Sequence, residues 1–518
     1  MQKHFDIIIA GSGHNALVAA CYLAKAGKSV LILEKNDYLG GATRSQKIFP
    51  EFDARISKYS YLISLFPKKI KEDLGLDIEL LSRKTASYTP YRDSFGNLKS
   101  LLFSNEDESI SKASVLELGY GEEEWAGYNL LQEKQKRFAA LIWESMLEPL
   151  KSREAWKDIF RLAGEEELWQ EFVEEPIGKL IEKHVKSDVL RGVLLTDARI
   201  GAFTSAHDPS LLQNQTYIYH IIGNRTGEWQ VPKGGMGKLV GELKNKAEML
   251  GVAFLTNSEV TSIQLQSDSV SMLAGGNKFT SEKLLWNAAP YWLNKLLEIP
   301  KRKDEGSAFK INILLKRLPK LLDETYSAEQ TFCGTFHIDQ SYSQQEQAHQ
   351  SNLSFELPQI FPCEMYCHTL TDASILSENL QKEGFHTVTV FGLDMAYRLF
   401  TEDNEAQKSR ALELFYKGIN QYLAEPFQDC IAKDSAGNLC IECSSALDLE
   451  ERLGMPGGNI FHTNLSWFFA ETDENIGNWG VETNDSRILL CGSGAVRGGA
   501  VSGIPGYLAA KKVLESTN

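Results

Sequence analysis

The stretch FDIIIAGSGHNALVAACYLAKAGKSVLILEK, residues 5–35, decides the fold. It predicts a buried strand at 5–10, a helix of small residues at 17–27 and a second strand at 30–34. A strand, a glycine turn, a helix and a strand in this order form a βαβ unit typical of dinucleotide binding. A glycine-rich turn in an ordinary α/β protein is the alternative, but it does not account for the acid that ends the second strand.

Single residues of this unit predict contacts with a dinucleotide. Gly11 permits the tight turn, and Gly13 lets the backbone approach a pyrophosphate whose charge the helix N-terminus stabilises. Ala16 is small enough for close packing of helix on strand, and Glu34 stands where a carboxylate can bind a ribose hydroxyl. The cofactor-binding residues predicted here are Gly11, Gly13, His14, Asn15, Ala16, Glu34 and Lys35.

Length and charge limit the possible functions. A chain of 518 residues predicts two or three domains. Its 54 basic and 69 acidic residues give a net charge of −15, which argues against nucleic acid and against electrostatic docking on anionic lipid. A hydrophobic contact with a membrane surface stays open.

The chain shows neither a targeting nor a spanning segment. No apolar run approaches the roughly 20 residues of a spanning helix, and the first strand begins at Phe5, so we expect a cytoplasmic protein. The eight cysteines are spread along the chain, which favours reduced thiols over a disulfide framework, and their spacing predicts no metal site.

The pattern of elements predicts an α/β protein with a discontinuous plan. We expect a Rossmann-like dinucleotide-binding domain from distant parts of the chain, a second domain with a mixed sheet, and a helical cap. A hairpin is predicted at 88–103, helices at 104–199, and strands of the second sheet at 310–315, 363–368 and 385–391. The predicted bounds are 1–80, 230–300 and 455–518 for the first domain, 81–103 and 301–454 for the sheet, and 104–229 for the cap.

Two further glycine turns favour FAD over NAD. Gly40, Gly41, Ala42, Thr43 and Arg44 follow the ribose-binding acid and let the backbone approach the cofactor again. Near the C-terminus, Gly492 and the turn Gly499, Ala500 and Val501 lead into a predicted helix at 507–514. A helix N-terminus aimed at a flavin would stabilise the negative charge of its reduced form.

At this point the chain resembles the phytoene desaturase family, within the wider amine-oxidase-like group of flavoproteins. Within the family it is most similar to the subgroup of pyridine nucleotide-disulfide oxidoreductase domain-containing protein two and its bacterial relatives. The motifs that carry the resemblance are residues 11–20, 59–62, 197–201, 234–237, 310–312 with 318–319, 457–462, and the C-terminal glycine run. The resemblance implies an FAD-dependent oxidoreductase with amine-oxidase-like architecture, and a backbone contact from Val260 to the adenine.

The resemblance also implies an apolar substrate. We expect dehydrogenation of a polyene- or lipid-like molecule by hydride transfer to flavin, because relatives act on long conjugated molecules such as carotenoids. No second nucleotide-binding unit is evident for NAD(P)H, so oxygen or a quinone is the expected electron acceptor. The sequence does not indicate the oligomeric state.

Two other functions remain open at this stage. One is redox-neutral isomerisation of a polyene. The other is a non-catalytic interaction or regulatory protein that keeps the flavoprotein fold. The second is suggested by Val496 and Arg497, which stand where many relatives carry His-Pro and would place a cation near the flavin edge.

A histidine and a cysteine pair have competing interpretations. His462 lies in a subgroup motif and is either a catalytic proton donor or polar anchor beside the flavin, or a partly buried histidine bonded to backbone. Cys440 and Cys443 have the spacing of a redox dithiol, but their stretch alternates like a strand, which favours a structural role.

Overall fold

The first sheet is assembled from three distant parts of the chain. The computed structural model describes residues 4–515, and five parallel strands lie in the order β10, β2, β1, β13, β19. Their bounds are His4–Ala10 (β1), Val30–Leu33 (β2), Ala253–Leu255 (β10), Asn277–Trp286 (β13) and Ile488–Leu490 (β19). Since β1 and β2 pair in parallel and α1 (His14–Lys25) connects them, the predicted βαβ unit is present.

An antiparallel extension widens one end of this sheet. β11 (Val260–Leu265) pairs with β12 (Val270–Ala274), and β12 pairs with the first half of β13. The second half of β13 is therefore free to pair with β19. This brings Val260 near the edge where β1 and β2 end, because Ser258 donates its backbone N–H to the carbonyl of Glu34.

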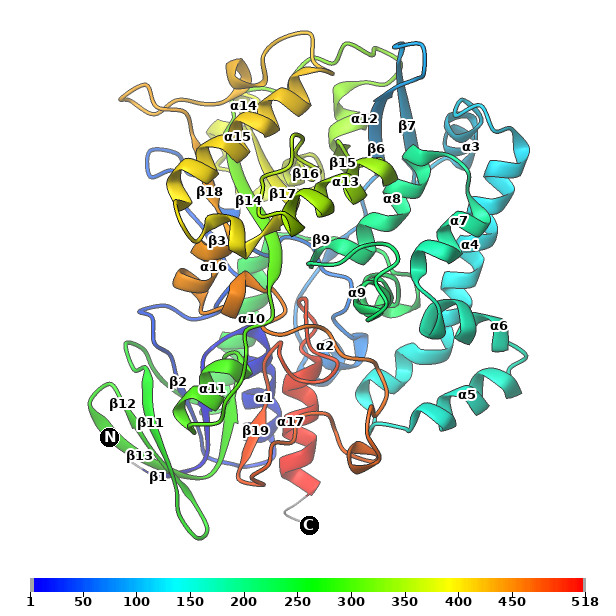
Figure 1. Cartoon of the computed structure of the whole chain (residues 1–518). Coiled ribbons are helices and arrows are strands. Elements are labelled where there is room, and N and C mark those ends of the chain that lie inside the picture. The colour runs from blue at the N-terminus through cyan, green and yellow to red at the C-terminus, as the bar shows by residue number, and fades with distance from the viewer. Residues whose placement is uncertain (1–3, 516–518) are drawn as a thin grey trace.

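Helices cover the first sheet with a continuous apolar core. α1 packs against α10 (Met236–Met249) and α17 (Ile504–Glu515), so that α17 stands beside α1 in Figure 1. Leu17, Val18 and Leu508 are among the fully buried residues of this core. Two shorter helices, α2 (Lys68–Leu74) and α11 (Pro290–Leu296), complete the domain.

The second sheet lies above the first in Figure 1 and is mostly antiparallel. Its strands follow the order β18, β14, β17, β16, β15, β6, β7, with only β15 and β6 parallel, while β8 pairs with β14. Their bounds are Thr85–Arg92 (β6), Leu98–Ser104 (β7), Gly201–Ala202 (β8), Gly306–Leu315 (β14), Thr335–Ile338 (β15), Cys363–Tyr366 (β16), His386–Ala396 (β17) and Ile441–Ser444 (β18).

Shorter elements surround this sheet. The helices of this part of the chain are α12 (Ala328–Phe332), α13 (Tyr342–Leu353), α14 (Glu378–Lys382), α15 (Asn404–Asn420) and α16 (Ala446–Leu453). Two small ribbons pair β3 (Ser45–Gln46) with β4 (Ile56–Ser57), and β5 (Leu80–Leu81) with β9 (Val231–Pro232).

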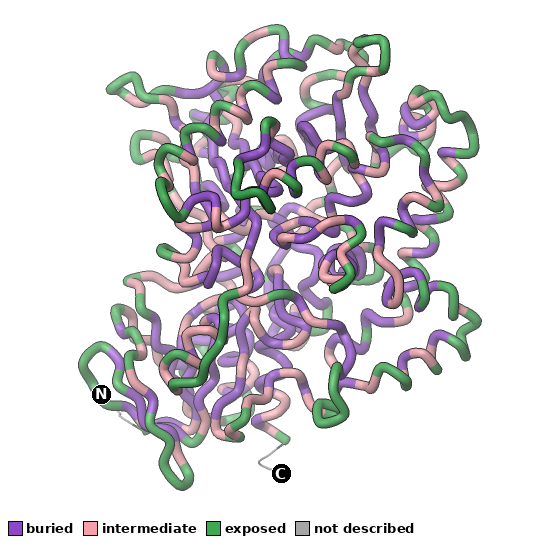
Figure 2. Tube along the Cα trace, viewed as in Figure 1, coloured by how far each residue is buried: buried purple, intermediate pink, exposed green. Residues whose placement is uncertain are grey.

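A block of helices forms one side of the molecule. It contains α3 (Glu108–Leu116), α4 (Glu122–Ile142), α5 (Arg153–Leu162), α6 (Glu166–Trp169), α7 (Ile177–His184), α8 (Asp188–Arg199) and α9 (Leu212–Ile221). Their outer faces are exposed and their inner faces are buried in Figure 2, as the charged, amphipathic sequence predicts. Phe138 and Phe172 stack at 4.6 Å between ring centroids inside the block.

The predicted fold class is confirmed: an α/β protein with a Rossmann-like domain, a mixed second sheet and a helical region. The predicted hairpin and the strands predicted at 310–315, 363–368 and 385–391 all lie in the second sheet. No helix among residues 4–515 is long and apolar enough to cross a membrane.

The cysteines are all free thiols, as expected. The redox-dithiol alternative for Cys440 and Cys443 is disfavoured, because burial raises their pKa values to about 11 and about 12.

Candidate functional site

One continuous cavity of about 1050 Å³ joins the two sheets. At one end its walls are the β1–α1 turn and the residues after β2, together with Val260 and the segment 449–455. At the other end they are side chains of the second sheet and of α8. A cavity of this size, placed where parallel strands end, is the usual position of a nucleotide or cofactor site in an open α/β sheet.

The turn between β1 and α1 presents bare backbone to the cavity. Gly11 has φ 96°, a left-handed conformation that favours glycine. Gly13 is the N-cap of α1 and provides no side-chain hydrogen bond to the helix's first N–H groups. Those N–H groups, with the positive end of the helix dipole, therefore form a binding site for an anion such as a pyrophosphate.

Glu34 lines the cavity at the end of β2, but its carboxylate is already well hydrogen-bonded. Its Oε2 accepts from the backbone N–H of Ser12 at 3.0 Å and from the Ser12 hydroxyl at 2.6 Å. Its Oε1 accepts from the backbone and side-chain nitrogens of Asn36, both at 2.9 Å. Glu34 therefore fixes the shape of the glycine turn, and its contact with a ribose stays a prediction.

The residues around the turn fit a dinucleotide. Three buried polar atoms lack any hydrogen-bond partner: His14 Nε2, Asn15 Oδ1 and Arg44 Nε. The Arg44 guanidinium lies 3.3 Å from the ring centroid of Tyr38, while His14 Nδ1 and the Thr43 hydroxyl are 3.0 Å apart. Of these residues, His14, Asn15 and Thr43 line the cavity, so a phosphate or sugar placed there would have groups to bind, which supports the predicted dinucleotide.

Most of the predicted cofactor residues line the cavity, and four do not. Those that line it are Gly11, Gly13, His14, Asn15, Glu34, Lys35, Gly40, Gly41, Ala42, Thr43, Val260, Ala500 and Val501. Ala16, Arg44, Gly492 and Gly499 are not among the residues that line the cavity. Their part in cofactor binding stays a prediction; Gly492 is needed for packing, since a Cβ there would lie 2.2 Å from the Asn287 carbonyl oxygen.

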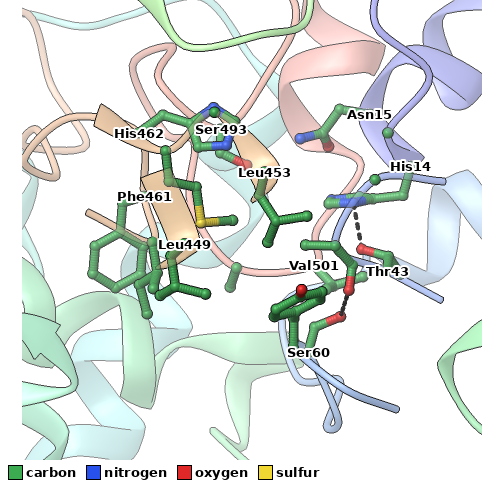
Figure 3. A pocket seen from close by; sticks show the side chains of 18 of the residues that line it. His14, Asn15, Thr43, Ser60, Leu449, Leu453, Phe461, His462, Ser493 and Val501 are labelled. Atoms are coloured by element: carbon green, nitrogen blue, oxygen red, sulfur yellow. Dashed lines mark hydrogen bonds between the residues drawn. The ribbon is translucent and has the colours of Figure 1, made fainter. Parts of the chain in front are cut away.

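His462 lies in the wall of the cavity. It follows Phe461, opposite His14 and Asn15 in the view of Figure 3. Burial lowers its pKa to about 4, and its Nδ1 has no partner. Burial and, to a smaller extent, the nearby His462 lower the pKa of His14. A neutral imidazole beside the nucleotide turn suits a polar anchor better than a proton donor, and both roles stay predictions.

Arg497 does not line the cavity, so the expectation of a cation near the flavin edge is wrong. The side chain is 1% exposed. Its Nε and Nη2 donate to the carbonyl of Phe468 at 3.1 and 3.0 Å, and its Nη1 donates to the carbonyl of Glu148. The guanidinium is thus bonded to backbone carbonyls outside the cavity. Arg497 therefore does not supply the cation beside the flavin that suggested a non-catalytic protein.

The far end of the cavity holds polar side chains to which the sequence analysis gave no role. They are Arg83, Asp197, His220, Lys310, Thr335, His337, Glu364 and Tyr366. Lys310 is 2% exposed, its Nζ lies 3.8 Å from the ring centroid of Tyr61, and burial lowers its pKa well below the ordinary value. We name this end the inner chamber, bounded by these eight residues together with Tyr61 and Phe391.

A signal for the inner chamber was present in the sequence. Lys310 interrupts the apolar strand Gly306–Leu315, and Glu364 interrupts Cys363–Tyr366. A charged residue in a strand buried along its whole length has either a partner or a function. The fact that the two strands belong to one sheet and face one cavity could not be seen without their register.

Comparison with known proteins agrees with this architecture. Residues 9–69 match the family model of an NAD(P)-binding Rossmann-like domain. An uncharacterized protein of Mycobacterium tuberculosis is 40% identical over 527 residues, covering 99% of this chain and 97% of the relative. Pyridine nucleotide-disulfide oxidoreductase domain-containing protein 2 of Rattus norvegicus is 27% identical over 583 residues, covering 99% and 94%.

More distant matches define the wider group. A phytoene desaturase of Fusarium fujikuroi is 28% identical over 308 residues, covering 56% of this chain and 50% of that protein. The structure of cyclohexylamine oxidase from Brevibacterium oxydans superposes with a TM-score of 0.57 at 15% identity, covering 99% of both chains. The chain belongs to the family of the mycobacterial protein and of pyridine nucleotide-disulfide oxidoreductase domain-containing protein 2, oxidoreductases related to phytoene desaturases and built on the amine-oxidase fold.

Proposed function

We propose that this protein is an FAD-dependent dehydrogenase of an apolar, polyene- or lipid-like small molecule. The continuous cavity that runs from the nucleotide turn to the second sheet carries this proposal, because it has room for a dinucleotide at one end and a substrate at the other. Bound FAD would supply the acceptor for two electrons and one hydrogen. The protein would supply binding, orientation and exclusion of water.

The nucleotide end of the cavity would hold the cofactor through backbone and side-chain contacts. The N-terminus of α1 would bind the pyrophosphate, and the unpartnered His14 Nε2 and Asn15 Oδ1 belong to residues that line the cavity and would contact the cofactor. Val260 would meet the adenine through its backbone, as the resemblance to the phytoene desaturase family implies.

Apolar side chains support the choice of substrate. Leu62, Val193, Ile200, Phe391 and Ile460 all line the cavity. They would orient an apolar molecule and exclude water around it. Because Arg497 does not line the cavity, a catalytic function is better supported than a non-catalytic one. Oxygen or a quinone would reoxidise the cofactor, and a peripheral membrane contact would be one route for an apolar substrate to enter.

The first experiment is the visible spectrum of the purified protein, with the cofactor released by denaturation and identified by chromatography. We expect stoichiometric FAD, and anaerobic bleaching of its absorbance by an apolar substrate. A colourless protein that cannot be reconstituted with FAD would overturn the proposal. Turnover of a polyene without any electron acceptor would instead establish isomerisation.

A matched pair of glycine variants localises the cofactor. Gly13→Val places a side chain at the nucleotide turn, where even a Cβ would lie 2.9 Å from Asn287 Nδ2. Gly241→Val is the control, because a Cβ at Gly241 in α10 has nothing within 4 Å. FAD content should fall at least about tenfold in the first variant, a loss of about 1.4 kcal/mol or more in binding, and remain unchanged in the second.

A further inference from the structure

A line of side chains crosses four neighbouring strands of the second sheet. Lys310 on β14 pairs with Phe391 on β17, Phe391 pairs with Glu364 on β16, and Glu364 pairs with His337 on β15. All four line the inner chamber. Since directly paired residues on adjacent strands project from the same face of a sheet, Lys310, Glu364 and His337 face the chamber together.

A second acid comes from a helix rather than from the sheet. Asp197 on α8 lines the same chamber, and its charge raises the pKa of Glu364. Within the described residues 4–515, neither carboxylate forms a salt bridge. By contrast, the buried Asp394 binds Arg199 directly, outside the chamber. The chamber thus holds two carboxylates that the fold does not use for ion pairing.

Glu364 is the acid with a fixed position and an available oxygen. The Tyr366 hydroxyl donates to Glu364 Oε2 at 2.5 Å, which holds the carboxyl group in place. Oε1 accepts no hydrogen bond from the residues that the structure describes. One oxygen is thus anchored while the other can receive a proton from a molecule in the chamber.

The charges around Glu364 oppose one another. Burial raises its pKa, as does Asp197, while the hydrogen bond from Tyr366 and the charges of Arg83 and Lys310 lower it. The outcome is a pKa of about 7. Other titratable neighbours are His337, which pairs with Glu364 across β15 and β16, and Tyr61 and Cys363, whose pKa values Glu364 helps to raise. His220 in turn lowers the pKa of Asp197.

Glu364 differs from two other bases that line the chamber. The Nζ of Lys310 is buried between the rings of Tyr61 and Phe391 and has no hydrogen-bond partner. His337 Nδ1 contacts Gln340 Oε1, and burial lowers the pKa of His337 to about 4. A base is most effective when its pKa lies near the working pH, a condition that Glu364 meets.

We propose that Glu364 accepts the proton that the substrate loses on dehydrogenation, and that Asp197 strengthens its hold on that proton; this rests on the proposed function. In the substrate, a C–H bond would break with its electron pair, and bound FAD would supply the acceptor for that hydride. The hydrogen on the neighbouring atom leaves as a proton to the Glu364 carboxylate, and the two substrate atoms form a double bond. Glu364 keeps the proton until the cofactor is reoxidised.

The substrate class follows from this arrangement. The oxidised bond lies at the polar end of the molecule, beside Glu364, while the rest of the molecule is apolar. A substrate of this kind is amphipathic, with a carbon or heteroatom next to the oxidised carbon that can release a proton. A hydrocarbon without such a group would leave the Oε1 of the buried Glu364 without a partner, at a cost in binding.

The proposal can be tested on the FAD-loaded protein without knowing the substrate. Reduction of the bound cofactor adds negative charge to the cavity, which raises the affinity of Glu364 for a proton. The midpoint potential, measured by spectroelectrochemistry from pH 5 to 9, should therefore show the uptake of an additional proton near neutral pH. Glu364→Gln should lose that additional proton, and Asp197→Asn should move it to lower pH.

A matched control and three outcomes decide whether Glu364 takes up the additional proton. Asp268→Asn removes an exposed acid outside the chamber and should reproduce the wild-type curve. A Glu364→Gln curve identical to that of the wild type overturns the inference and leaves the proposed function standing. Failure of the wild-type protein to bind FAD overturns the proposed function first. Where Glu364→Gln does not retain FAD, an unshifted Asp197→Asn curve overturns the inference.

Discussion

At the residue scale, the buried arginine of the C-terminal loop has a structural role. Arg497 connects the loop to two carbonyls that lie 29 and 349 positions away in the chain. Arg497→Lys keeps the charge but cannot reach both acceptors in the same geometry. We expect the free energy of unfolding to fall by about 3 kcal/mol, as for other broken buried ionic hydrogen bonds. Denaturant unfolding measures this fall.

The same variant tests whether Arg497 contacts the cofactor. Since Arg497 does not line the cavity, the FAD absorbance maximum of Arg497→Lys should equal that of the wild type. A shifted flavin spectrum with unchanged stability would mean that the guanidinium contacts the cofactor after all.

A buried histidine gives a prediction about acid stability. Burial lowers the pKa of His368 to about 3, so it stays neutral in the folded protein, whereas it takes up a proton near pH 6.5 when the chain unfolds. Stability is therefore lost as the pH falls below about 6.5. His368→Phe keeps the stacking on Tyr366, at 5.8 Å between ring centroids, and removes this titration.

The size of the effect follows from the two pKa values. From pH 8 to pH 5, the variant should lose about 2 kcal/mol less unfolding free energy than the wild type. Urea unfolding at both pH values measures the difference. Equal losses in the two proteins would show that His368 is protonated in the folded state or solvated there.

At the element scale, the crossing of α1 and α17 fixes the nucleotide turn. Gly506 lies so close to α1 that a Cβ there would stand 2.0 Å from the Asn15 carbonyl oxygen. Gly506→Ala should push the helices apart, lower the unfolding free energy by about 1–3 kcal/mol and reduce the FAD content, because Asn15 lines the cavity. Thermal unfolding and the flavin absorbance check both effects. Gly241→Ala is the control, and equal behaviour of the two variants would contradict this account.

The nucleotide turn was predictable from sequence because its parts are local. Strand, turn, helix and acid lie within residues 5–35, and each has a short-range cause. The inner chamber was not predictable in this way. Lys310, Glu364 and His337 are brought together by strand register between segments far apart in the chain, which local patterns do not encode. The position predicted for Arg497 was wrong for the same reason, because the carbonyls that it binds lie 29 and 349 positions away in the chain.

At the scale of the whole molecule, the cavity lies between the two sheets and couples their stability to the ligand. FAD that binds only the folded protein should stabilise it by about 2.7 kcal/mol at a free concentration 100 times its dissociation constant. The melting temperature of the apoprotein should therefore rise steadily with added FAD. Riboflavin lacks the pyrophosphate and adenosine, so it should have little effect. Equal shifts by the two compounds would argue against binding at the α1 N-terminus.

The assembly of the first sheet from three chain segments has a consequence for biosynthesis. β1 and β2 emerge from the ribosome early, whereas β19 and α17 are made last. At 5–20 residues per second, the apolar face of α1 waits roughly 25–100 s for its partner. A cofactor that binds only the completed turn then distinguishes finished chains from interrupted ones, and the unfinished chains remain targets for chaperones and proteases.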